Sequence, residues 1–586
     1  MIHSKIPLAQ TVIQLCKQKN IKHIVISPGS RNAPLTLGFT NDDFFTCYSI
    51  VDERCAAFFA LGIAQQTKEP AVVVCTSGSA LLNYYPAVAE AFFSDIPLIV
   101  LSADRPKHLI GIGDGQTINQ KEVFEKNILY SANLKLDLKN DKRSADKDEL
   151  LIFKNLENKL ERILGLQQNI QSYNEDEINT AYNLARFSNG PVHINIPFDE
   201  PLYDVVEVLS VHPKAEEFDL KTPKIDQAEL KDCLDEWYVS KKKMFLIGVL
   251  PPNEIEQQWL NDLSNDDSVI VFTETTSNVH HKSFFPSIDK MIAPLEDIDF
   301  KNLQPDILIT IGGLIVSKKI KAFLRTYKPE HHWHIGEKNA NDTFFCLNKH
   351  LAVKPNNFFI EFLPKITHVV KSNYRQAWTT VKQWRSKKHL EYVKQIPFSD
   401  FKAFNFMFKS VPNKTILQLG NSSTIRYAQL FNMNPSLDVF CNRGTSGIDG
   451  STSTAIGAAV AGSKQTTFIT GDLSFFYDSN ALWNNYIPKN FRIIVVNNQG
   501  GGIFRILPGH KNTDNFDYFF ETKHHLTARQ LCDMYGFEYT TAHNEEQLEI
   551  ALKPFYNKSK QPRLLEVFTP RTENDSILLD YFKFVK

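Results

Sequence analysis

The chain has 586 residues, of which 42% are hydrophobic and 22% are charged, and its formal net charge is −1. This length exceeds what one core supports and predicts about three or four domains. The near-zero charge excludes an overall field that would favour nucleic acid or a membrane surface. The eight cysteines form no CxxC motif and no pairing rhythm. We therefore expect free thiols in a reducing cytoplasm, and no apolar run is long enough for membrane insertion.

In chain order, short apolar runs alternate with longer segments of helical period. The runs lie at 23–27, 71–77, 96–103 and 191–196 in the first third, at 244–250, 268–274, 306–313 and 331–336 in the middle third, and at 415–420, 438–442, 466–472, 492–498 and 563–569 in the last third. Continuous Val/Ile runs bounded by Gly, Ser and Pro are typical of strands buried on both faces of a parallel sheet. The sequence therefore predicts an α/β fold with three doubly wound parallel-sheet domains.

Two stretches separate the three blocks of strands. Residues 200–226 are irregular and contain three prolines. Residues 366–400 form one polar segment of helical period, rich in Lys and Arg. That segment could be a basic binding face, but a solvated connecting helix is the favoured interpretation. We therefore predict domains at 1–200, 201–365 and 366–586, the last including this helical linker.

Polar residues follow two of the predicted strands in the last third. Asp472 comes directly after one strand and Asn498 stands at the end of the next, just before the glycines at 500–502. Ligands of open α/β sheets bind at the carboxyl ends of the strands. A carboxylate and an amide oxygen suit Mg²⁺, and glycines let the backbone approach a ligand closely. The pattern predicts a Mg²⁺-diphosphate site; on these residues alone, a helix-capping Asp472 and a turn at Asn498 explain it equally well.

Seven sequence blocks, in order, carry a resemblance to a known family. They lie at 27–35, 51–62, 76–91, 101–106, 420–426, 442–457 and 497–508. The stretch "GDLSFFYDSNALWNNYIPKNFRIIVVNNQGGG" resembles the Gly-Asp…Asn-Asn signature of thiamine-diphosphate enzymes. The blocks together resemble the 2-succinyl-5-enolpyruvyl-6-hydroxy-3-cyclohexene-1-carboxylate synthases of menaquinone biosynthesis. The resemblance is much weaker between residues 200 and 400, and it implies a pyrimidine-binding first domain and a diphosphate-binding last domain.

The resemblance assigns the cofactor site. It implies that Asp472, Asn498 and the backbone carbonyl of Gly500 hold Mg²⁺ or Mn²⁺, which binds the diphosphate of thiamine diphosphate. It makes Glu53 the catalytic acid that hydrogen-bonds the cofactor pyrimidine, although by pattern alone Glu53 is only a favourable acid in the first turn of a helix. In this family the glutamate and the metal ligands come from different subunits, which implies a homodimer or homotetramer. The further cofactor-binding residues by resemblance are Ser422, Ile448, Gly471, Leu473, Ser474, Gly501 and Ile503.

Arginines indicate the kind of substrate. Arg31, Arg105 and Arg443 directly follow predicted strand ends, and arginine binds carboxylates with two parallel hydrogen bonds. The resemblance implies two dicarboxylate substrates, 2-oxoglutarate and isochorismate. It gives the substrate-binding residues as Ser30, Arg31, Arg105, Gln116, Lys318, Arg426, Arg443, Phe504 and Leu507, with Gln116 also catalytic. Gly115 departs from the family, which has Asn at that position.

The reaction implied by the resemblance is decarboxylation of 2-oxoglutarate and 1,4-addition of the resulting succinyl group to isochorismate. Another thiamine-diphosphate-dependent 2-oxoacid decarboxylase or carboligase is the alternative, and it predicts fewer arginines directed at carboxylates. A non-catalytic scaffold would lack Glu53 or Asp472, and both are present. No histidine stands in the matched blocks, and we interpret His280 and His281 as surface or structural residues.

Overall fold

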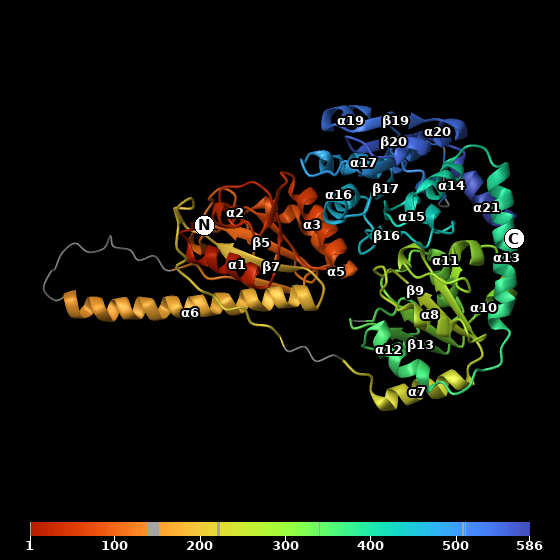
Figure 1. The fold of residues 1–586 in the computed structure, drawn as a ribbon, viewed down its shortest axis with the longest axis horizontal. Helices are drawn as coiled ribbons and strands as arrows, with labels where there is room; N and C mark the ends of the chain where they lie inside the picture. Colours follow the sequence, from red (N-terminus) through yellow and green to blue (C-terminus); the bar gives the residue numbers. More distant parts are fainter. Residues whose placement is uncertain are drawn as a thin grey trace. The chain divides into compact units, whose positions relative to one another are not determined.

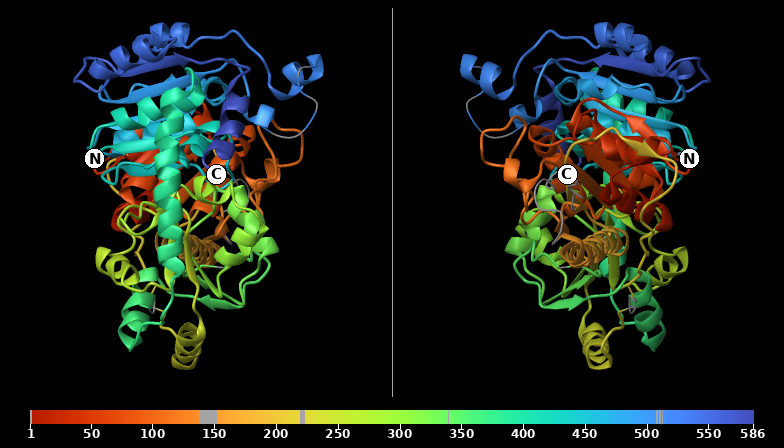
Figure 2. Two further views of the ribbon diagram at one scale, coloured as in Figure 1. Left: turned by 90° about the vertical axis from the view of Figure 1, so that its right-hand side faces the viewer. Right: turned by 90° about the vertical axis from the view of Figure 1, so that its left-hand side faces the viewer.

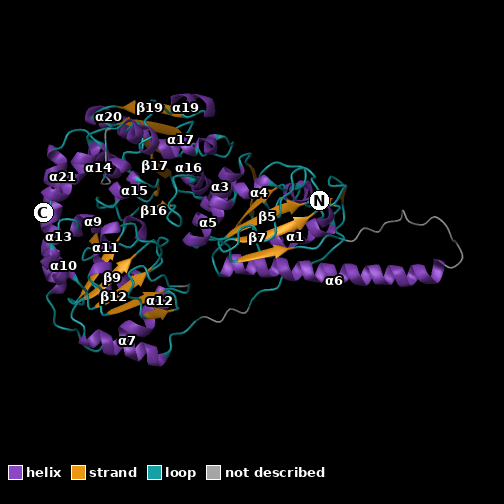
Figure 3. Cartoon of the chain, turned by 180° about the vertical axis from the view of Figure 1, so that it is seen from behind, coloured by secondary structure: helices purple, strands orange, loops and turns teal. Residues whose placement is uncertain are grey.

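The structure is a computed structural model, and it describes residues 2–137, 152–218, 223–338, 340–506, 509, 511 and 513–586. Its described residues form three six-stranded parallel sheets, each flanked by helices (Figures 1 and 3). The α/β fold class predicted from the sequence is therefore confirmed. A separate antiparallel pair joins β1 (His3–Ser4) to β8 (Val205–Val206).

The first sheet has the strand order β3-β2-β4-β5-β7-β6. Its strands are β2 (His23–Ile26), β3 (Thr46–Ser49), β4 (Ala71–Cys75), β5 (Leu98–Asp104), β6 (Tyr130–Asn133) and β7 (Val192–Pro197). Its helices are α1 (Pro7–Gln18), α2 (Ala33–Thr40), α3 (Glu53–Thr67), α4 (Ser79–Asn83), α5 (Tyr85–Ser94) and α6 (Ile152–Phe187). Every residue of β4 and β5 is buried, as expected for central parallel strands. Helices α1 and α6 share one core with alternate strand residues, and α6 extends well beyond the sheet (Figure 1).

The middle sheet has the order β11-β10-β9-β12-β13-β14. Its strands are β9 (Lys243–Ile247), β10 (Val269–Thr273), β11 (Phe285–Pro286), β12 (Ile307–Ile311), β13 (His331–Ile335) and β14 (Lys349–Leu351). Its helices are α7 (Gln227–Val239), α8 (Gln257–Leu263), α9 (Ile288–Ile292), α10 (Asp297–Leu303), α11 (Lys318–Thr326) and α12 (Pro355–Phe362). Residues of β9 alternate between two hydrophobic cores, so both faces of this sheet are covered.

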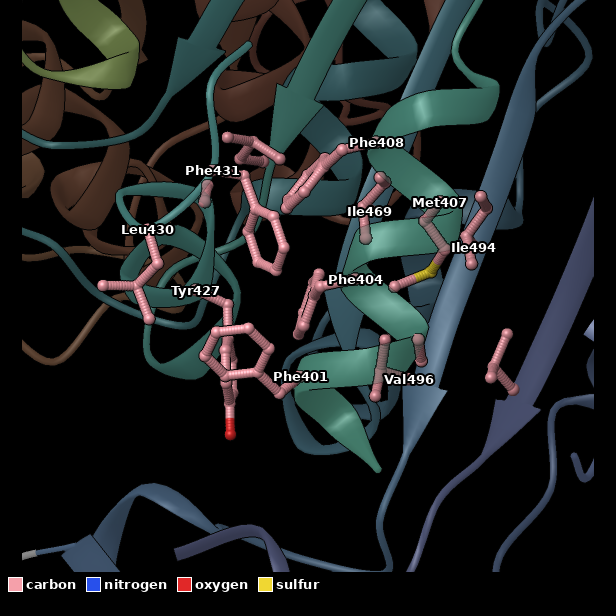
Figure 4. Close-up of a cluster of buried hydrophobic side chains, with 14 of the residues drawn as sticks. Phe401, Phe404, Met407, Phe408, Tyr427, Leu430, Phe431, Ile469, Ile494 and Val496 are labelled. Carbon is pink, nitrogen blue, oxygen red and sulfur yellow. The ribbon is translucent and has the colours of Figure 1, made fainter. Parts of the chain in front are cut away.

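The last sheet has the order β16-β15-β17-β18-β20-β19. Its strands are β15 (Ile416–Leu419), β16 (Asp438–Cys441), β17 (Thr466–Gly471), β18 (Arg492–Asn497), β19 (Glu538–Ala542) and β20 (Arg563–Phe568). The α-helices between residues 374 and 584 are α13 (Tyr374–Gln395), α14 (Asp400–Ser410), α15 (Ser423–Ala428), α16 (Ser451–Ala461), α17 (Asp472–Tyr477), α18 (Ile503–Ile506), α19 (Arg529–Tyr535), α20 (Glu545–Phe555) and α21 (Asn574–Phe584). Phe401, Phe404 and Met407 of α14 pack on a core that includes Ile469 and Ile494 of the sheet (Figure 4). This core fixes α14 on the face of the strands that end at the candidate site.

The linker helix α13 is less solvated than the sequence indicated. It connects the middle and last sheets (Figure 2), and its buried residues are Tyr374, Trp378, Arg385, His389, Tyr392 and Val393. Its Arg385 donates to the carbonyl of Lys290 (3.2 Å), and Nδ1 of His389 lies 2.8 Å from the Tyr581 hydroxyl. The interpretation as a solvated helix was therefore wrong for these residues. No helix in the described ranges combines the length and hydrophobicity needed to cross a membrane.

The chain divides into two compact units. The first comprises Met1–Asp219, Thr452–Ser463 and Asp478–Ile487, and the second comprises the remainder. Within the first unit, α3 and α16 meet at glycines: a Cβ atom on Gly62 would lie 2.1 Å from the Thr454 carbonyl oxygen, and one on Gly457 would lie 2.0 Å from that of Phe59. Segments of the last third therefore group with the first sheet. The three-domain division at residues 200 and 365 stays a prediction.

Candidate active site

Asp472 and the turn after β18 meet at the carboxyl edge of the last sheet. Strands β17 and β18 are neighbours, so the residues that follow them lie close together. Asp472 is buried; its Oδ1 accepts a hydrogen bond from the backbone N–H of Leu473 (2.7 Å) and its Oδ2 one from that of Gly500 (3.0 Å). The carboxylate is thus held in one orientation by the backbone on either side.

Asn498 is held by a second acid that the sequence analysis missed. Its Nδ2 donates to Oδ2 of Asp400 (2.9 Å), and Oδ1 of Asp400 accepts from the Thr569 hydroxyl (2.5 Å). The pKa of Asp400 is raised to about 6, chiefly by burial. The hydrogen bonds from Thr569 and Asn498 lower this pKa, and the charge of Asp472 raises it. Among the described residues no protein group donates to Oδ1 of Asn498, so this oxygen is available to a ligand.

The glycine turn brings backbone close to backbone. Gly500 has φ 149°, and a Cβ atom there would lie 2.6 Å from the carbonyl oxygen of Glu521. The N–H of Gly501 donates to the same oxygen (2.6 Å). By contrast, a Cβ atom on Gly471 would meet nothing within 4 Å, so open space lies beside the end of β17. The turn can therefore present backbone atoms to a ligand in that space.

These groups fit a hard cation. The donor set comprises the Asp472 carboxylate, the Asn498 amide oxygen and the Gly500 carbonyl, which are oxygen ligands of the type that Mg²⁺ prefers beside phosphate and water. Among the residues that the structure describes, no group of three His, Cys, Asp or Glu side chains is arranged to hold a metal ion. The oxygen donors at this edge of the sheet are therefore one carboxylate, one amide and the backbone.

His524 is a further neighbour that lies outside the matched sequence blocks. Its Nε2 lies 3.2 Å from Oδ2 of Asp472, and its Nδ1 accepts from the backbone N–H of Leu526 (3.1 Å). The second contact places the ring proton on Nε2, which lies near the carboxylate but forms no hydrogen bond with any of the described residues. Only the three-dimensional structure reveals His524, because its sequence position follows no strand.

The apolar side of the site is formed by residues that a ligand can reach. Ile448 is 36% exposed, and its backbone carbonyl accepts from the Ser474 hydroxyl (2.7 Å). Leu473, Gly501 and Ile503 are half-buried. Phe504 is likewise partly exposed, which suits a wall of a binding pocket. Leu507, the remaining predicted member of this wall, lies outside the described residues.

Two predicted substrate arginines are neighbours in the second unit. Arg426 donates to the backbone carbonyl of Ser422 (2.6 Å), and Arg443 donates to Oδ1 of Asn421 (2.8 Å). Burial lowers the pKa of Arg426, and the charge of Arg443 lowers it further. Ser422 has φ 65°, an uncommon conformation for a residue other than glycine, and in the described chain nothing bonds its hydroxyl. Paired cations beside a free hydroxyl favour an anionic ligand.

Glu274 lies near these arginines and was also missed by the sequence analysis. Its carboxylate accepts from the backbone N–H groups of Val316 (2.7 Å) and Ser317 (2.8 Å). Burial raises its pKa to about 7, these hydrogen bonds oppose the rise, and the charge of Arg443 also lowers it. Lys318, predicted to bind substrate, is exposed at the start of α11. Glu274 therefore holds the segment that leads into Lys318.

In the first unit, Glu53 begins α3. The helix is capped by Asp52, whose side chain accepts from the N–H of Cys55 (3.2 Å). Glu53 itself is half-buried, and its Oε2 lies 3.5 Å from Nδ2 of Asn83. Its charge raises the pKa of the buried Cys75 thiol, although burial is the main cause of that shift. The Glu53 carboxylate is thus only weakly engaged and remains available to a ligand.

Arg31 and Arg105 both lie close enough to Asp104 to affect its pKa. Burial raises the pKa of Asp104, while hydrogen bonds and then the charges of the two arginines lower it. Each arginine also has its own carboxylate: Arg31 lies 3.2 Å from Glu200, and Arg105 lies 3.1 Å from Asp114. The Nε atoms of both arginines are buried and have no hydrogen-bond partner among the described residues. Each guanidinium thus has one donor that its protein surroundings leave unpaired.

Gln116 lies on a loop that one buried side chain anchors. Gln120 accepts from the backbone N–H of Gly78 (2.9 Å) and donates to Oδ1 of Asn195 (2.7 Å). Gln116 is exposed and has φ 55°, and a Cβ atom on Gly115 would meet nothing within 4 Å. No steric reason therefore requires glycine at 115. Ser30, the last predicted substrate residue, is exposed after β2.

A cavity of about 410 Å³ in the first unit lies next to this region. Its walls come from Ile26, Pro28 and Gly29, from α2 and β3, and from Tyr203 and Tyr486. None of the predicted site residues within the described chain lines it. It is therefore adjacent to the candidate site without being part of it.

Comparison with known proteins identifies the class. Residues 6–126 match the family described as thiamine pyrophosphate enzyme, N-terminal TPP binding domain, and residues 420–567 match the C-terminal TPP binding domain of such enzymes. The chain is thus a thiamine-diphosphate-dependent enzyme.

Named relatives narrow this class. The chain is 55% identical to the 2-succinyl-5-enolpyruvyl-6-hydroxy-3-cyclohexene-1-carboxylate synthases of Christiangramia forsetii and Flavobacterium psychrophilum, with all of each chain covered. It is 34% identical to that of Porphyromonas gingivalis, over 98% of this chain and 96% of that protein. The chain belongs to this family of synthases, which confirms the resemblance stated from the sequence.

Proposed function

We propose that this enzyme decarboxylates 2-oxoglutarate and adds the resulting succinyl group to isochorismate in a 1,4-addition, giving the product named in its relatives. The observation that supports this choice of substrates is the presence of two arginine pairs. Arg31 and Arg105 both lower the pKa of Asp104, and the charge of Arg443 lowers the pKa of Arg426. Dicarboxylates are the substrates that such pairs bind best, because each guanidinium can form parallel hydrogen bonds with one carboxylate.

The proposed cofactor site uses the oxygen donors at the carboxyl edge of the last sheet. Asp472, Asn498 and the Gly500 carbonyl would hold Mg²⁺ or Mn²⁺ against the cofactor diphosphate, and Glu53 would hydrogen-bond the pyrimidine ring. When bound, thiamine diphosphate supplies an electron sink for the decarboxylation. The open space beside Gly471 and the fixed orientation of Asp472 support this assignment. The remaining cofactor contacts are assigned to Ser422, Ile448, Gly471, Leu473, Ser474, Gly501 and Ile503.

The protein's part in the reaction is to bind, orient and transfer protons. The proposed substrate contacts are Gln116, Ser30, Lys318, Phe504 and Leu507, together with the four arginines. We further propose, from the family resemblance, a homodimer or homotetramer in which Glu53 and the metal ligands of one site come from different subunits. The domain assignment is likewise a proposal: pyrimidine-binding 1–200, central 201–365 and diphosphate-binding 366–586.

The test is incubation of the purified protein with thiamine diphosphate, Mg²⁺, 2-oxoglutarate and isochorismate, followed by mass spectrometry. The proposal expects CO₂ and one product whose mass equals the sum of the substrates less CO₂. Pyruvate in place of 2-oxoglutarate is the matched control. Equal turnover of pyruvate, or CO₂ release with no adduct, would favour a simpler 2-oxoacid decarboxylase instead.

A further inference from the structure

Asp400 is a buried acid next to the proposed metal site, and every polar atom of its side chain is engaged. It is 2% exposed. One carboxylate oxygen accepts from Asn498 (2.9 Å) and the other from Thr569 (2.5 Å). A buried carboxylate is costly unless its hydrogen bonds are satisfied. An acid at this position therefore calls for a role beyond filling space.

The contact with Asn498 decides which end of that amide faces the ligand. An amide side chain has one end that donates and one that accepts. Because Asp400 accepts from Nδ2, the nitrogen end of Asn498 faces the acid and Oδ1 lies at the other end. A neutral apolar residue at 400 would leave the amide free to turn about its last torsion. The oxygen would then be a metal ligand only part of the time.

Asp400 is itself rigidly placed. It is the first residue of α14, whose N-terminus is capped by the Ser399 hydroxyl. Its backbone N–H donates to Oδ1 of Asn574 (2.8 Å), and the Nδ2 of that residue donates to the carbonyl of Pro570 (2.6 Å). The next residue, Phe401, is fully buried in the core under the last sheet (Figure 4). The backbone at Asp400 is thus fixed by its helix start, by Asn574 and by the buried neighbour Phe401, and this fixes the position from which the carboxylate reaches Asn498.

We propose that Asp400 is a positioning residue for the metal site: its carboxylate locks the Asn498 amide with Oδ1 presented to the cation. The inference rests on the proposed role of Asn498 and adds a residue that no sequence motif indicated. Outer hydrogen-bond partners of metal ligands typically contribute about 10–100-fold to metal affinity. We expect an effect in this range from removing the Asp400 contact.

The test measures thiamine-diphosphate binding by titration calorimetry at increasing Mg²⁺ concentration. D400A should raise the Mg²⁺ midpoint by about 10–100-fold, and saturating Mg²⁺ should restore the wild-type affinity for the cofactor. D400N keeps an acceptor for Nδ2 of Asn498 and should stay close to the wild type. A general folding defect would instead weaken cofactor binding at every Mg²⁺ concentration, and saturating Mg²⁺ would not restore it.

A matched control comes from the middle sheet. Asp266 is also buried and accepts from the backbone N–H (2.8 Å) and hydroxyl (2.5 Å) of Ser268. D266A should leave the Mg²⁺ midpoint unchanged. A wild-type midpoint for D400A would overturn the proposal, as would a D400N defect equal to that of D400A, because charge rather than orientation would then be responsible.

Two outcomes separate this inference from the proposed function. If the wild type binds thiamine diphosphate without any dependence on Mg²⁺, the metal site itself is wrong. If the wild type shows the dependence and D400A shows the same one, only the role of Asp400 is wrong. Should D400A not fold, D400L carries the test, since it fills the position without offering an acceptor to Nδ2 of Asn498; a raised Mg²⁺ midpoint supports the proposal and an unchanged one overturns it.

Discussion

Replacing Glu521 by Gln should loosen the glycine turn of the candidate site. Glu521 is fully buried, and its carboxylate pairs with Arg505, including a 2.6 Å hydrogen bond from Nη2, and with Arg571. Its backbone oxygen also receives the N–H of Gly501 (2.6 Å). In E521Q the side-chain amide would turn an N–H group toward a guanidinium. The ion pairs that hold this segment would then be lost.

The magnitude follows from the burial of the cluster. Removing one partner of a buried ion pair costs about 3–5 kcal/mol, because the other charge is left without compensation. Asp517 lies 3.3 Å from both Arg505 and Arg571 and retains part of the pairing. We therefore expect a loss of about 3 kcal/mol, at the lower end of the range. If this loss falls on local opening, exchange of the protected amides should accelerate by about 150-fold.

Hydrogen exchange followed by mass spectrometry measures this directly. Peptides that contain Gly501 and Glu521 should exchange faster in E521Q, whereas peptides from the first sheet should not change. D580N is the control, because the Asp580–Lys583 pair is exposed and such pairs contribute about 0–1 kcal/mol. Unchanged exchange at Gly501 in E521Q would refute the reasoning, since the cluster would then not stabilise the turn.

Four further predictions address the chemistry. E53Q should bind thiamine diphosphate nearly as well as the wild type but exchange the thiazolium proton far more slowly, as followed by NMR; an unchanged exchange rate would remove Glu53 from its assigned role. D472A should abolish Mg²⁺-dependent binding of thiamine diphosphate, and unaltered affinity in calorimetry would contradict the assignment of Asp472 as a metal ligand. Pyruvate lacks the distal carboxylate, and one lost charged hydrogen bond costs about 1.5–3 kcal/mol, so the enzyme should prefer 2-oxoglutarate to pyruvate by about ten- to 150-fold. The variants R31A, R105A, R426A and R443A should divide into those impaired in CO₂ release and those impaired only in product formation. Normal kinetics in all four variants would reject the dicarboxylate assignment. The pKa of Glu274 is raised to about 7 from 4.5, chiefly by burial, so the folded chain binds this proton more tightly than the unfolded chain and the free energy of unfolding falls as pH rises through that window. In denaturant unfolding measured from pH 4.5 to 8, E274Q should remove up to about 3 kcal/mol of this fall. The same fall in E274Q and the wild type would show that Glu274 does not titrate in this range.

The central strands were predictable and the edge strands mostly were not. Strands such as β4, "AVVVC", are buried on both faces and therefore read as continuous apolar runs. Edge strands contact one neighbour only and remain partly exposed, so β19, "EYTTA", and β14, "KHL", carry mixed side chains that show no strand period. The sequence pattern thus identified the middle of each sheet and missed most of its borders.

The site shows the same division between local and distant information. Asp472 and Asn498 could be found because each follows an apolar strand. Asp400 could not, since it lies 98 residues before Asn498 and its own neighbourhood shows only a helix start. His524 likewise reaches Asp472 from a segment without regular period. Side chains that orient the site from other elements leave no spacing signal in the chain, and only their contacts reveal them.

The meeting of α3 and α16 also limits which sequences can carry this fold. At Gly62 and Gly457 the obstacle to a side chain is the carbonyl oxygen of the opposite helix, which cannot change rotamer. Even a single methyl group would push the two helix axes apart, and α3 begins with Glu53. A library that varies every position of these helices should therefore retain glycine at both sites while tolerating exchange at most neighbours. The close packing of the two helices thus depends on the absence of a side chain at Gly62 and at Gly457, and one added carbon atom at either position would disrupt it.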